Sequence, residues 1–448
     1  MARCSSLDVA LLRAPWIFLL LCWLPWSAAF PPTLPREDEA ISTVPDYVTR
    51  FAPLLWLHSE DPFRPADILQ HVRHTTPAVQ FQPMAGLPDL DLDSLAWLND
   101  QAGSTQGPVA LTANDDITAL PEWLLGETPD AHGALHNSTA CVVVLVPSAR
   151  DPVVVDAFYF YFYSYDRGAN ITQVLPPLKS LLDDIADGMH YGNHVGDWEH
   201  NMVRFRNGTP VGIYYSQHSD GSAYDWDDET LSLTGERPVV YSAYGSHANW
   251  AFPGDHIHDE VLVDYCDAGQ LWDPVSMAYF YRFDPTTTKL TRIYPPGLPN
   301  GSNFTSFLHY SGLWGDLQYP DDHPRQKTVP YFGLKRYVSG PTGPMTKQLV
   351  RKGLFPDDRG RKSWLQWAVG VFMSLYPCCF RGWRAWLSGA VFVGLLTSFV
   401  LAFIFAVTRH RASRTGYKKV DAGVDVPLET LEYRDDINSG AVDDAFRR

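Results

Sequence analysis

Phenylalanine and tyrosine alternate without interruption from Phe158 to Tyr163, and this pattern most constrains the fold of the chain. Successive side chains of a β-strand point to opposite faces, so the segment predicts a strand with phenyl rings on one face and phenols on the other. Such a strand belongs to a sheet that is buried on at least one face. β-Branched or aromatic runs bounded by turn residues predict further strands, at 141–146, 198–205, 211–215 and 239–243.

Helix signals are few in the middle of the chain, and the best candidate is 174–185, which includes a Pro-Pro pair. The sequence therefore predicts a mainly β fold, a β-sandwich-like domain with a few helices. Neither a repeat nor a low-complexity tract interrupts residues 46–337, so we expect one domain there. A Pro-rich linker at 30–45 leads into it, and a Pro/Gly-rich, then basic, linker at 338–363 follows it.

The N-terminus has the order of a secretory signal peptide, predicted at residues 1–29. Basic Arg3 and Arg13 come first, an apolar run starts near Trp16, and small residues end at Ala29, where we expect cleavage. A signal anchor is the alternative, although the apolar core is short for a membrane span.

A membrane span is predicted at residues 386–408, an uncharged apolar run long enough to cross a hydrocarbon core of about 30 Å. Basic residues follow at once, so the positive-inside bias places the tail, 409–448, in the cytosol and the domain in the lumen. Residues 364–380 are aromatic and short for a span, and we expect them to lie at the membrane interface. A membrane hairpin is the alternative for that segment.

Sequons and cysteines support a lumenal domain. Asn-X-Ser/Thr sequons predict N-glycosylation at Asn137, Asn170, Asn207, Asn300 and Asn303. Cys141 and Cys266 are the only cysteines of the predicted domain, and an oxidising compartment predicts a disulfide between them. Two buried free thiols are the alternative.

The charge of the chain and its tail bear on partners. A net charge of −16 argues against nucleic acid, whose binding requires basic groups that neutralise phosphates. In the tail, Tyr417 and Val420 have the tyrosine-to-aliphatic spacing of a sorting signal that adaptor proteins read. The pattern is short, so chance occurrence is the alternative.

Two carboxylates and two imidazoles lie close together in His194-Val-Gly-Asp-Trp-Glu-His200. Along a strand, Asp197 and Glu199 project to one side and His200 to the other, while the intervening glycine lets His194 fold back toward the carboxylates. Oxygen ligands favour calcium, magnesium or manganese, and the imidazole extends the range to zinc. The alternative is a solvated strand end whose carboxylates pair with nearby arginines.

A second cluster centres on His247, which follows Gly-Ser at the end of a predicted strand. Loops at sheet edges commonly carry sites, and the preceding glycine permits close approach, so we expect His247 to bind a ligand. His200 is the second candidate for ligand binding. Two further histidines, His256 and His258, share a face if extended, but they lack a recognised zinc spacing.

Three motifs resemble the vacuolar protein sorting-associated protein 62 family and occur in the right order. They are Asn193-His-Val-Gly-Asp-Trp-Glu-His200, Tyr244-Gly-Ser-His-Ala-Asn249 and Phe51-Ala-Pro-Leu-Leu-Trp-Leu-His-Ser-Glu60. The resemblance spans most of the predicted domain. It implies a role in delivering proteins to the vacuole and carries no information about chemistry.

A more distant resemblance links the same segment to necrosis- and ethylene-inducing peptide-like proteins, which carry Gly-His-Arg-His-Asp-Trp-Glu. In that family the first His, the Asp and the Glu help to bind a divalent cation at a membrane-glycolipid recognition site. The resemblance implies this role for His194, Asp197 and Glu199, with Asp187 or Asp184 as a further carboxylate. Glycine replaces the motif's second His and asparagine its first Gly, which weakens the case for a shared cytolytic activity.

These features together predict a type I single-pass glycoprotein of vacuolar or endosomal membranes. Its lumenal domain is expected to use a divalent cation, calcium or magnesium, in binding a glycan or lipid headgroup. One alternative is a metal-dependent hydrolase with His247 or His200 as acid or base, and the other is a cargo receptor without a metal role. Neither a nucleophile elbow nor a Cys/His arrangement is present to support an enzyme.

Overall fold

The computed structural model describes residues 43–101, 107–170, 190–218, 220–258, 262–296, 304–328, 333–358, 364 and 383–414. Nearly all described residues up to 358 belong to one compact unit, and the C-terminal helix belongs to a second unit. The predicted signal peptide, the helix candidate at 174–185, the interfacial segment beyond 364 and the tail signal at Tyr417 and Val420 lie outside the described residues.

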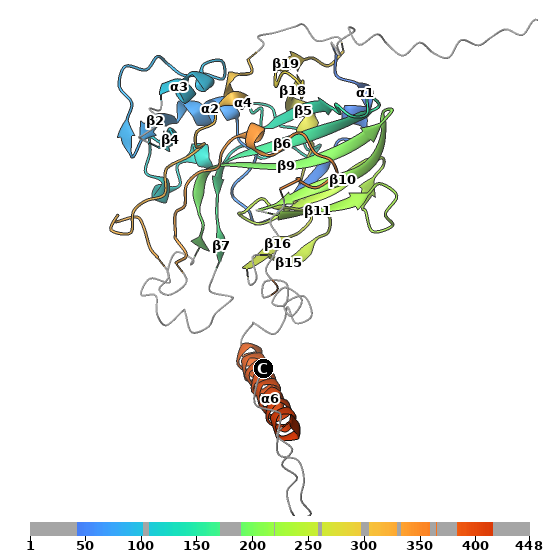
Figure 1. Cartoon of the computed structure of the whole chain (residues 1–448). Coiled ribbons are helices and arrows are strands. Elements are labelled where there is room, and N and C mark those ends of the chain that lie inside the picture. The colour runs from blue at the N-terminus through green and yellow to red at the C-terminus, as the bar shows by residue number, and fades with distance from the viewer. Residues whose placement is uncertain are drawn as a thin grey trace, which may run out of the picture. The chain divides into compact units, whose positions relative to one another are not determined.

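Seven strands form the main sheet of the first unit, in the order β11-β10-β9-β6-β5-β18-β19 (Figure 1). The two longest, β6 (Val154–Asp166) and β9 (His194–Arg206), have 13 residues each and pair antiparallel. The others are β5 (Cys141–Pro147), β10 (Thr209–Gln217), β11 (Asp220–Asp225), β18 (Ala278–Phe283) and β19 (Leu290–Ile293). Only the β18–β5 pair is parallel within this sheet.

A second sheet has the order β12-β13-β1-β17, with β14 also paired to β13. Its strands are β1 (Leu54–Leu57), β12 (Leu233–Thr234), β13 (Arg237–Ser242), β14 (Asn249–Trp250) and β17 (Gln270–Trp272). A small third sheet contains β2 (Thr75–Val79), β3 (Gln82–Pro83) and β4 (Ala110–Ala113). Further short strands are β7 (Ala169–Asn170), β8 (His190–Tyr191), β15 (Gly254–His258) and β16 (Leu262–Cys266).

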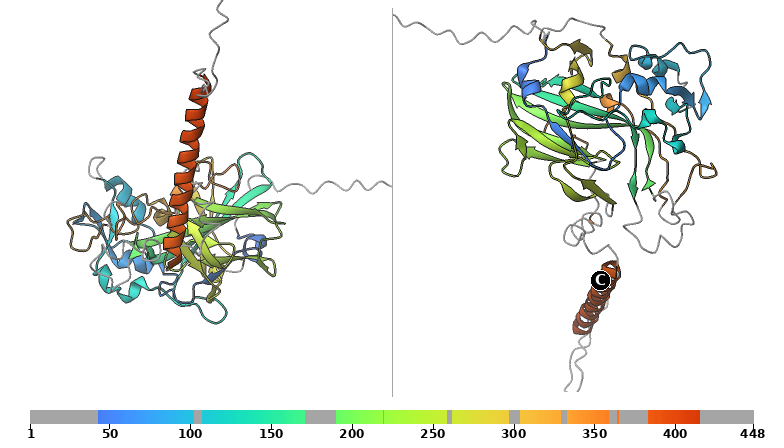
Figure 2. Two further views of the ribbon diagram at one scale, coloured as in Figure 1. Left: turned by 90° about the horizontal axis from the view of Figure 1, so that it is seen from below. Right: turned by 180° about the vertical axis from the view of Figure 1, so that it is seen from behind.

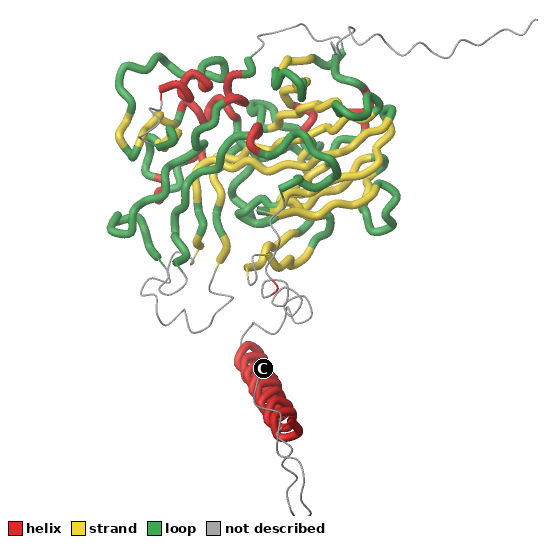
Figure 3. The backbone as a smooth tube through the Cα atoms, in the orientation of Figure 1, coloured by secondary structure: helices red, strands yellow, loops and turns green. Residues whose placement is uncertain are grey.

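The helices of the first unit are short, and strands and loops make up most of it (Figure 3). They are α1 (Asp46–Arg50), α2 (Ile68–Arg73), α3 (Leu98–Gln101) and α4 (Ser306–His309), with 3₁₀ turns η1 (Leu95–Trp97), η2 (Ile117–Ala119), η3 (Glu122–Leu124), η6 (Pro274–Met277) and η7 (Pro344–Thr346). Helices α2, α3 and α4 gather at one side of the unit beside β2 and β4 (Figure 1). The mainly β, sandwich-like fold that the sequence predicts is confirmed.

Both faces of β6 are buried, which goes further than the prediction of one buried face. The phenyl rings of Phe158, Phe160 and Phe162 pack in a cluster with α2, α3 and α4. The phenol rings of the three intervening tyrosines pack in a second cluster with β1, β13 and Trp272. The main sheet is therefore the middle of three layers.

Hydrogen bonds explain how phenols can occupy a core face. The hydroxyl of Tyr159 donates to the carbonyl of Val48 at 2.6 Å, and that of Tyr161 donates to Asn201 Oδ1 at 2.9 Å. A buried hydroxyl without a partner would cost stability, so these contacts allow Tyr159 and Tyr161 to occupy the core face.

The described part of the predicted linker at 338–363 packs on the first unit. Leu349 is buried in the phenylalanine-side cluster. Arg351 is buried too, and it donates to the carbonyls of Lys347, Gln348 and Leu354 while it lies over the rings of Phe158 and Tyr214. Long basic side chains can bury their apolar stems, so a basic composition is compatible with this packing.

The predicted disulfide also requires correction. Cys141 and Cys266 are both free and buried. Cys141 lies in the cluster on the tyrosine side of β6, whereas Cys266 lies in a small separate cluster with Ala243 and Ala248. Burial raises the pKa of both thiols, so they remain protonated and serve as small apolar core residues.

In the second unit, α6 (Trp383–Arg414) is a continuous helix of 32 residues (Figure 2). Its segment Gly389–Arg411 is long and apolar enough to cross a membrane, and it is the only such segment among the described helices. The predicted span at 386–408 falls within α6.

Candidate functional site

Strand β9 passes close beneath the backbone of Trp314 at Gly196. Gly196 has a φ of 71°, and a Cβ at this position would lie 2.2 Å from the Trp314 carbonyl oxygen. The same oxygen lies 2.8 Å from Nε2 of His71. Only glycine combines this φ with this close approach, and it does so between His194 and Asp197.

The alternation predicted for β9 is present in the structure. Asp197 and Glu199 lie opposite Tyr163 and Tyr161 of β6, on the face that meets the second sheet. His200 points to the other face, where it contacts Arg351 and stacks near Phe160. The strand therefore brings the two carboxylates into the core and sends His200 away from them.

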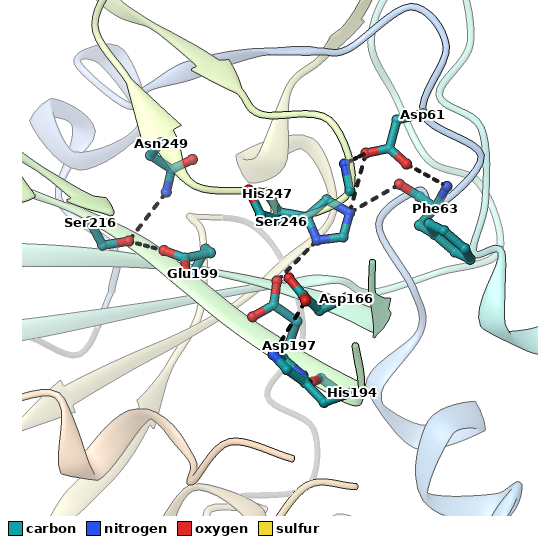
Figure 4. A network of polar contacts seen from close by, with 12 residues as sticks. Asp61, Phe63, Asp166, His194, Asp197, Glu199, Ser216, Ser246, His247 and Asn249 are labelled. Atoms are coloured by element: carbon teal, nitrogen blue, oxygen red, sulfur yellow. Dashed lines mark hydrogen bonds and ion pairs between the residues drawn. The ribbon is translucent and has the colours of Figure 1, made fainter. Parts of the chain in front are cut away.

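His247 reaches the carboxylates from the second sheet (Figure 4). It lies in the loop between β13 and β14 with a φ of 53°, and its ring stacks on Tyr163 with 3.7 Å between centroids. Nδ1 lies 3.0 Å from Asp197 Oδ2, while Nε2 lies 3.3 Å from the Phe63 carbonyl and 3.5 Å from Asp61 Oδ2. Its orientation is fixed from three sides.

Asp166, Asp197 and His247 form a group whose donor atoms all lie within 4.8 Å of one another. The three residues are 6%, 5% and 1% exposed. Asp166 ends β6, and its Oδ2 lies 3.6 Å from Nε2 of His194 (Figure 4). His194 also places Nδ1 2.7 Å from the Gly196 carbonyl, so it lies beside the group and not within it.

The predicted set of His194, Asp197 and Glu199 is thus rearranged. Only Asp197 belongs to the three-residue group, and Glu199 instead accepts a hydrogen bond from Ser216 on β10. The predicted further carboxylate, Asp187, lies outside the described residues. His200, predicted to bind a ligand with His247, lies on the opposite face of the sheet.

Electrostatics in this core favour a cation. Burial raises the pKa of Asp166 well above its usual value, and repulsion from Asp197 and Glu199 adds to the effect. Burial likewise raises the pKa of Glu199. For Asp197, burial is outweighed by the hydrogen bond and charge of His247, so its pKa is lowered. Carboxylates this close share too few positive partners to ionise together.

The donor set fits a divalent cation. Two carboxylates supply oxygen and one imidazole supplies nitrogen, a combination that magnesium, calcium, manganese and zinc sites can use. The second nitrogen of His247 faces a carbonyl and the Asp61 carboxylate, which is how a metal-binding histidine is commonly held in place.

Asp166 is the residue of this group that sequence reasoning missed. It lies three residues after the aromatic alternation, at the end of the same strand. Antiparallel pairing sets it opposite His194, so aligning the two predicted strands by their buried faces would have pointed to it.

The comparisons with known proteins place the chain in a family. A family model described as vacuolar protein sorting-associated protein 62 matches residues 156–265, which include all three members of the group. The protein TDA6 of Saccharomyces cerevisiae is 33% identical over 365 residues, covering 75% of this chain and 73% of the relative. This chain belongs to the vacuolar protein sorting-associated protein 62 family. The yeast protein of that name is 32% identical over 370 residues, covering 74% of each chain.

Solved structures resemble this family member only weakly. One titled as a toxin fold for microbial attack and plant defense covers 54% of this chain at 14% identity, with a TM-score of 0.23. Necrosis and Ethylene inducing Protein 2, from the agent of cocoa's Witches Broom disease, covers 47% at 15% identity with a TM-score of 0.20. TM-scores of this size support neither a shared site nor a shared ligand. The evidence for the group of Asp166, Asp197 and His247 is the geometry of this protein alone.

Proposed function

We propose that this protein is a type I single-pass membrane glycoprotein that acts in protein sorting to the vacuole, with a lumenal domain built around a divalent cation. Membership of a family whose yeast relative is named for vacuolar protein sorting supports the pathway. The apolar helix α6 supports the membrane anchor. The observation that supports the cation site is the convergence of Asp166, Asp197 and His247 in a buried, carboxylate-rich core.

The cation would tie the two sheets together. Asp166 and Asp197 belong to the main sheet, whereas His247 comes from a loop of the second sheet. Calcium or magnesium bound to all three would offset the repulsion among the carboxylates and clamp the edge of the sandwich. The group is too buried for its three members to face a partner directly.

We assign the contact with a glycan or lipid headgroup to the edge beside His194. This side chain is 18% exposed, more than that of Asp166 or Asp197 beside it. His194 also touches Asp166, so an occupied cation site would fix its position. The cation would then hold in place the residues beneath the contact surface, and it would not itself touch the ligand.

The membrane orientation has a direct test. In intact microsomes that contain the full chain, added protease should remove an epitope placed after Arg448 and leave the domain intact. Glycosidase treatment should lower the mass of the protected fragment, because sequons are modified only on the lumenal side. A protected epitope with a digested domain would reverse the proposed orientation.

The tail signal is tested by replacing its aromatic residue. Tyr417→Ala should shift the protein from vacuolar or endosomal membranes toward the cell surface, because the tyrosine ring would lose its pocket on an adaptor protein. Folding and glycosylation should stay unchanged, since the change lies in the proposed cytosolic tail. Lys418→Ala, a neighbouring change that keeps the tyrosine and the valine, should leave the distribution unaltered. Identical distributions of Tyr417→Ala and the parent would exclude this signal.

A further inference from the structure

A cavity of about 760 Å³ lies against α2 and the segments 122–128 and 137–138. Its volume falls within the range of about 300–1,000 Å³ that is typical of small-molecule sites. Ser164 of β6 reaches its wall and lies 3.1 Å from Nδ1 of His71, which is itself bonded to Trp314. The cavity is separate from the proposed cation site, because neither Asp166, Asp197 nor His247 lines it.

The wall of the cavity has the chemistry of a site for neutral sugars. Trp123 and His74 form a stacked pair, with 5.1 Å between centroids and 4° between ring planes. Trp123 Nε1 donates to Asp115 Oδ2 at 2.8 Å, which holds the indole in place. Carboxylates, amides and hydroxyls make up most of the remaining described lining, which includes neither lysine nor arginine. Sugar rings pair an apolar face with many hydroxyls, so they match a flat aromatic ring beside polar acceptors.

Asn137 lines the same cavity and begins the sequon Asn137-Ser-Thr. The residue is exposed. Its backbone N–H donates to the Glu127 carboxylate at 3.1 Å, and that of His136 donates to the same carboxylate at 2.9 Å. The sequon therefore starts from a fixed backbone position on the cavity wall.

We propose that the cavity holds the chain's own N-glycan, attached at Asn137, with its first sugars packed against Trp123. The proposal rests on the lumenal orientation given above. In the transfer, Asn137 Nδ2 forms a bond to the anomeric carbon of a sugar on a lipid diphosphate carrier. The bond from that carbon to the diphosphate oxygen breaks, the lipid diphosphate leaves with the bonding electron pair, and the proton lost by the amide is released to solvent. The sugar chain then starts beside the aromatic pair and covers it.

Asn207 provides a matched control within the same chain. It also begins a sequon and is also exposed, but it lies in the turn between β9 and β10. It is not among the residues that line the cavity. A glycan on Asn207 would extend into solvent.

The test is site-resolved deglycosylation of the folded, full-length protein in detergent, followed by peptide mass spectrometry. We expect an endoglycosidase to release the Asn137 glycan roughly tenfold more slowly than the Asn207 glycan, the factor that about 1.4 kcal/mol of packing supplies. After denaturation the two rates should be equal. Trp123→Ala should bring the native Asn137 rate to that of Asn207, whereas Trp123→Phe, which keeps an aromatic face, should preserve most of the protection.

Each outcome decides between the proposals. Equal native rates at the two sites of the parent protein would overturn the cavity proposal, and this comparison needs no variant to fold. Modification at Asn207 with none at Asn137 would also overturn it while leaving the orientation intact. Absence of glycans from every sequon would overturn the lumenal orientation as well.

Discussion

Replacing Gly196 with alanine should lower the free energy of unfolding of the first unit by about 2–5 kcal/mol. Roughly 1–2 kcal/mol comes from forcing an L-residue to a positive φ. A further 1–3 kcal/mol or so comes from displacing the Trp314 backbone, whose oxygen would lie 2.2 Å from the new Cβ. Thermal or denaturant unfolding of the full chain in detergent measures the loss.

Gly235 is the matched control for this change. Its φ is 64°, close to that of Gly196, but no heavy atom lies within 4 Å of the position that a Cβ would occupy, so only the backbone cost applies. Gly235→Ala should therefore cost roughly 1–2 kcal/mol. Equal losses at the two positions would show that the approach to Trp314 does not constrain β9.

Removal of the proposed cation should lower the melting temperature of the parent protein. A cation present at about 1,000 times its Kd contributes about 4.1 kcal/mol, and this contribution disappears when a chelator is added. Without the cation, Asp166 must take up a proton to remain in the buried core, because burial and the neighbouring carboxylates raise its pKa, and this proton uptake costs folding free energy. Differential scanning calorimetry with and without chelator, at constant pH, measures the shift.

Asp166→Asn gives this prediction a distinctive signature. The variant should lose the response to chelator, because a neutral amide replaces a cation ligand. Without cation it should melt above the chelated parent, since asparagine does not have to take up a proton on folding as Asp166 does, yet below the cation-bound parent. Asp227→Asn, a change at an exposed carboxylate, should keep the full response. An unchanged melting temperature of the parent protein on addition of chelator would contradict the proposal that a cation holds the two sheets together.

Patterns along a single strand were the predictable part of this fold. The Phe-Tyr alternation identified β6, and the same period correctly separated Asp197 and Glu199 from His200 on β9. These inferences succeed because side-chain direction in a strand follows from chain position alone.

Contacts between strands of different sheets could not be read in this way. His247 meets Asp197 because β13 and β9 lie in sheets that pack face to face, a relation that the local sequence does not encode. The same reason explains the cysteines, since a shared oxidising compartment does not bring Cys141 and Cys266 together. The burial of Arg351 is a further contact of this kind, since nothing in the basic sequence around it indicates that the side chain packs on the first unit.

The most direct test of the proposed cation site is the metal content of the full-length protein, purified in detergent without added metal. Inductively coupled plasma mass spectrometry should find one divalent cation per parent chain and per Asp227→Asn chain. Asp166→Asn, Asp197→Asn and His247→Ala should each lose it, because each removes one of the three donors. A parent protein that holds no stoichiometric divalent cation, even after equilibration with calcium, magnesium, manganese and zinc, would contradict the account, as would variants that retain it.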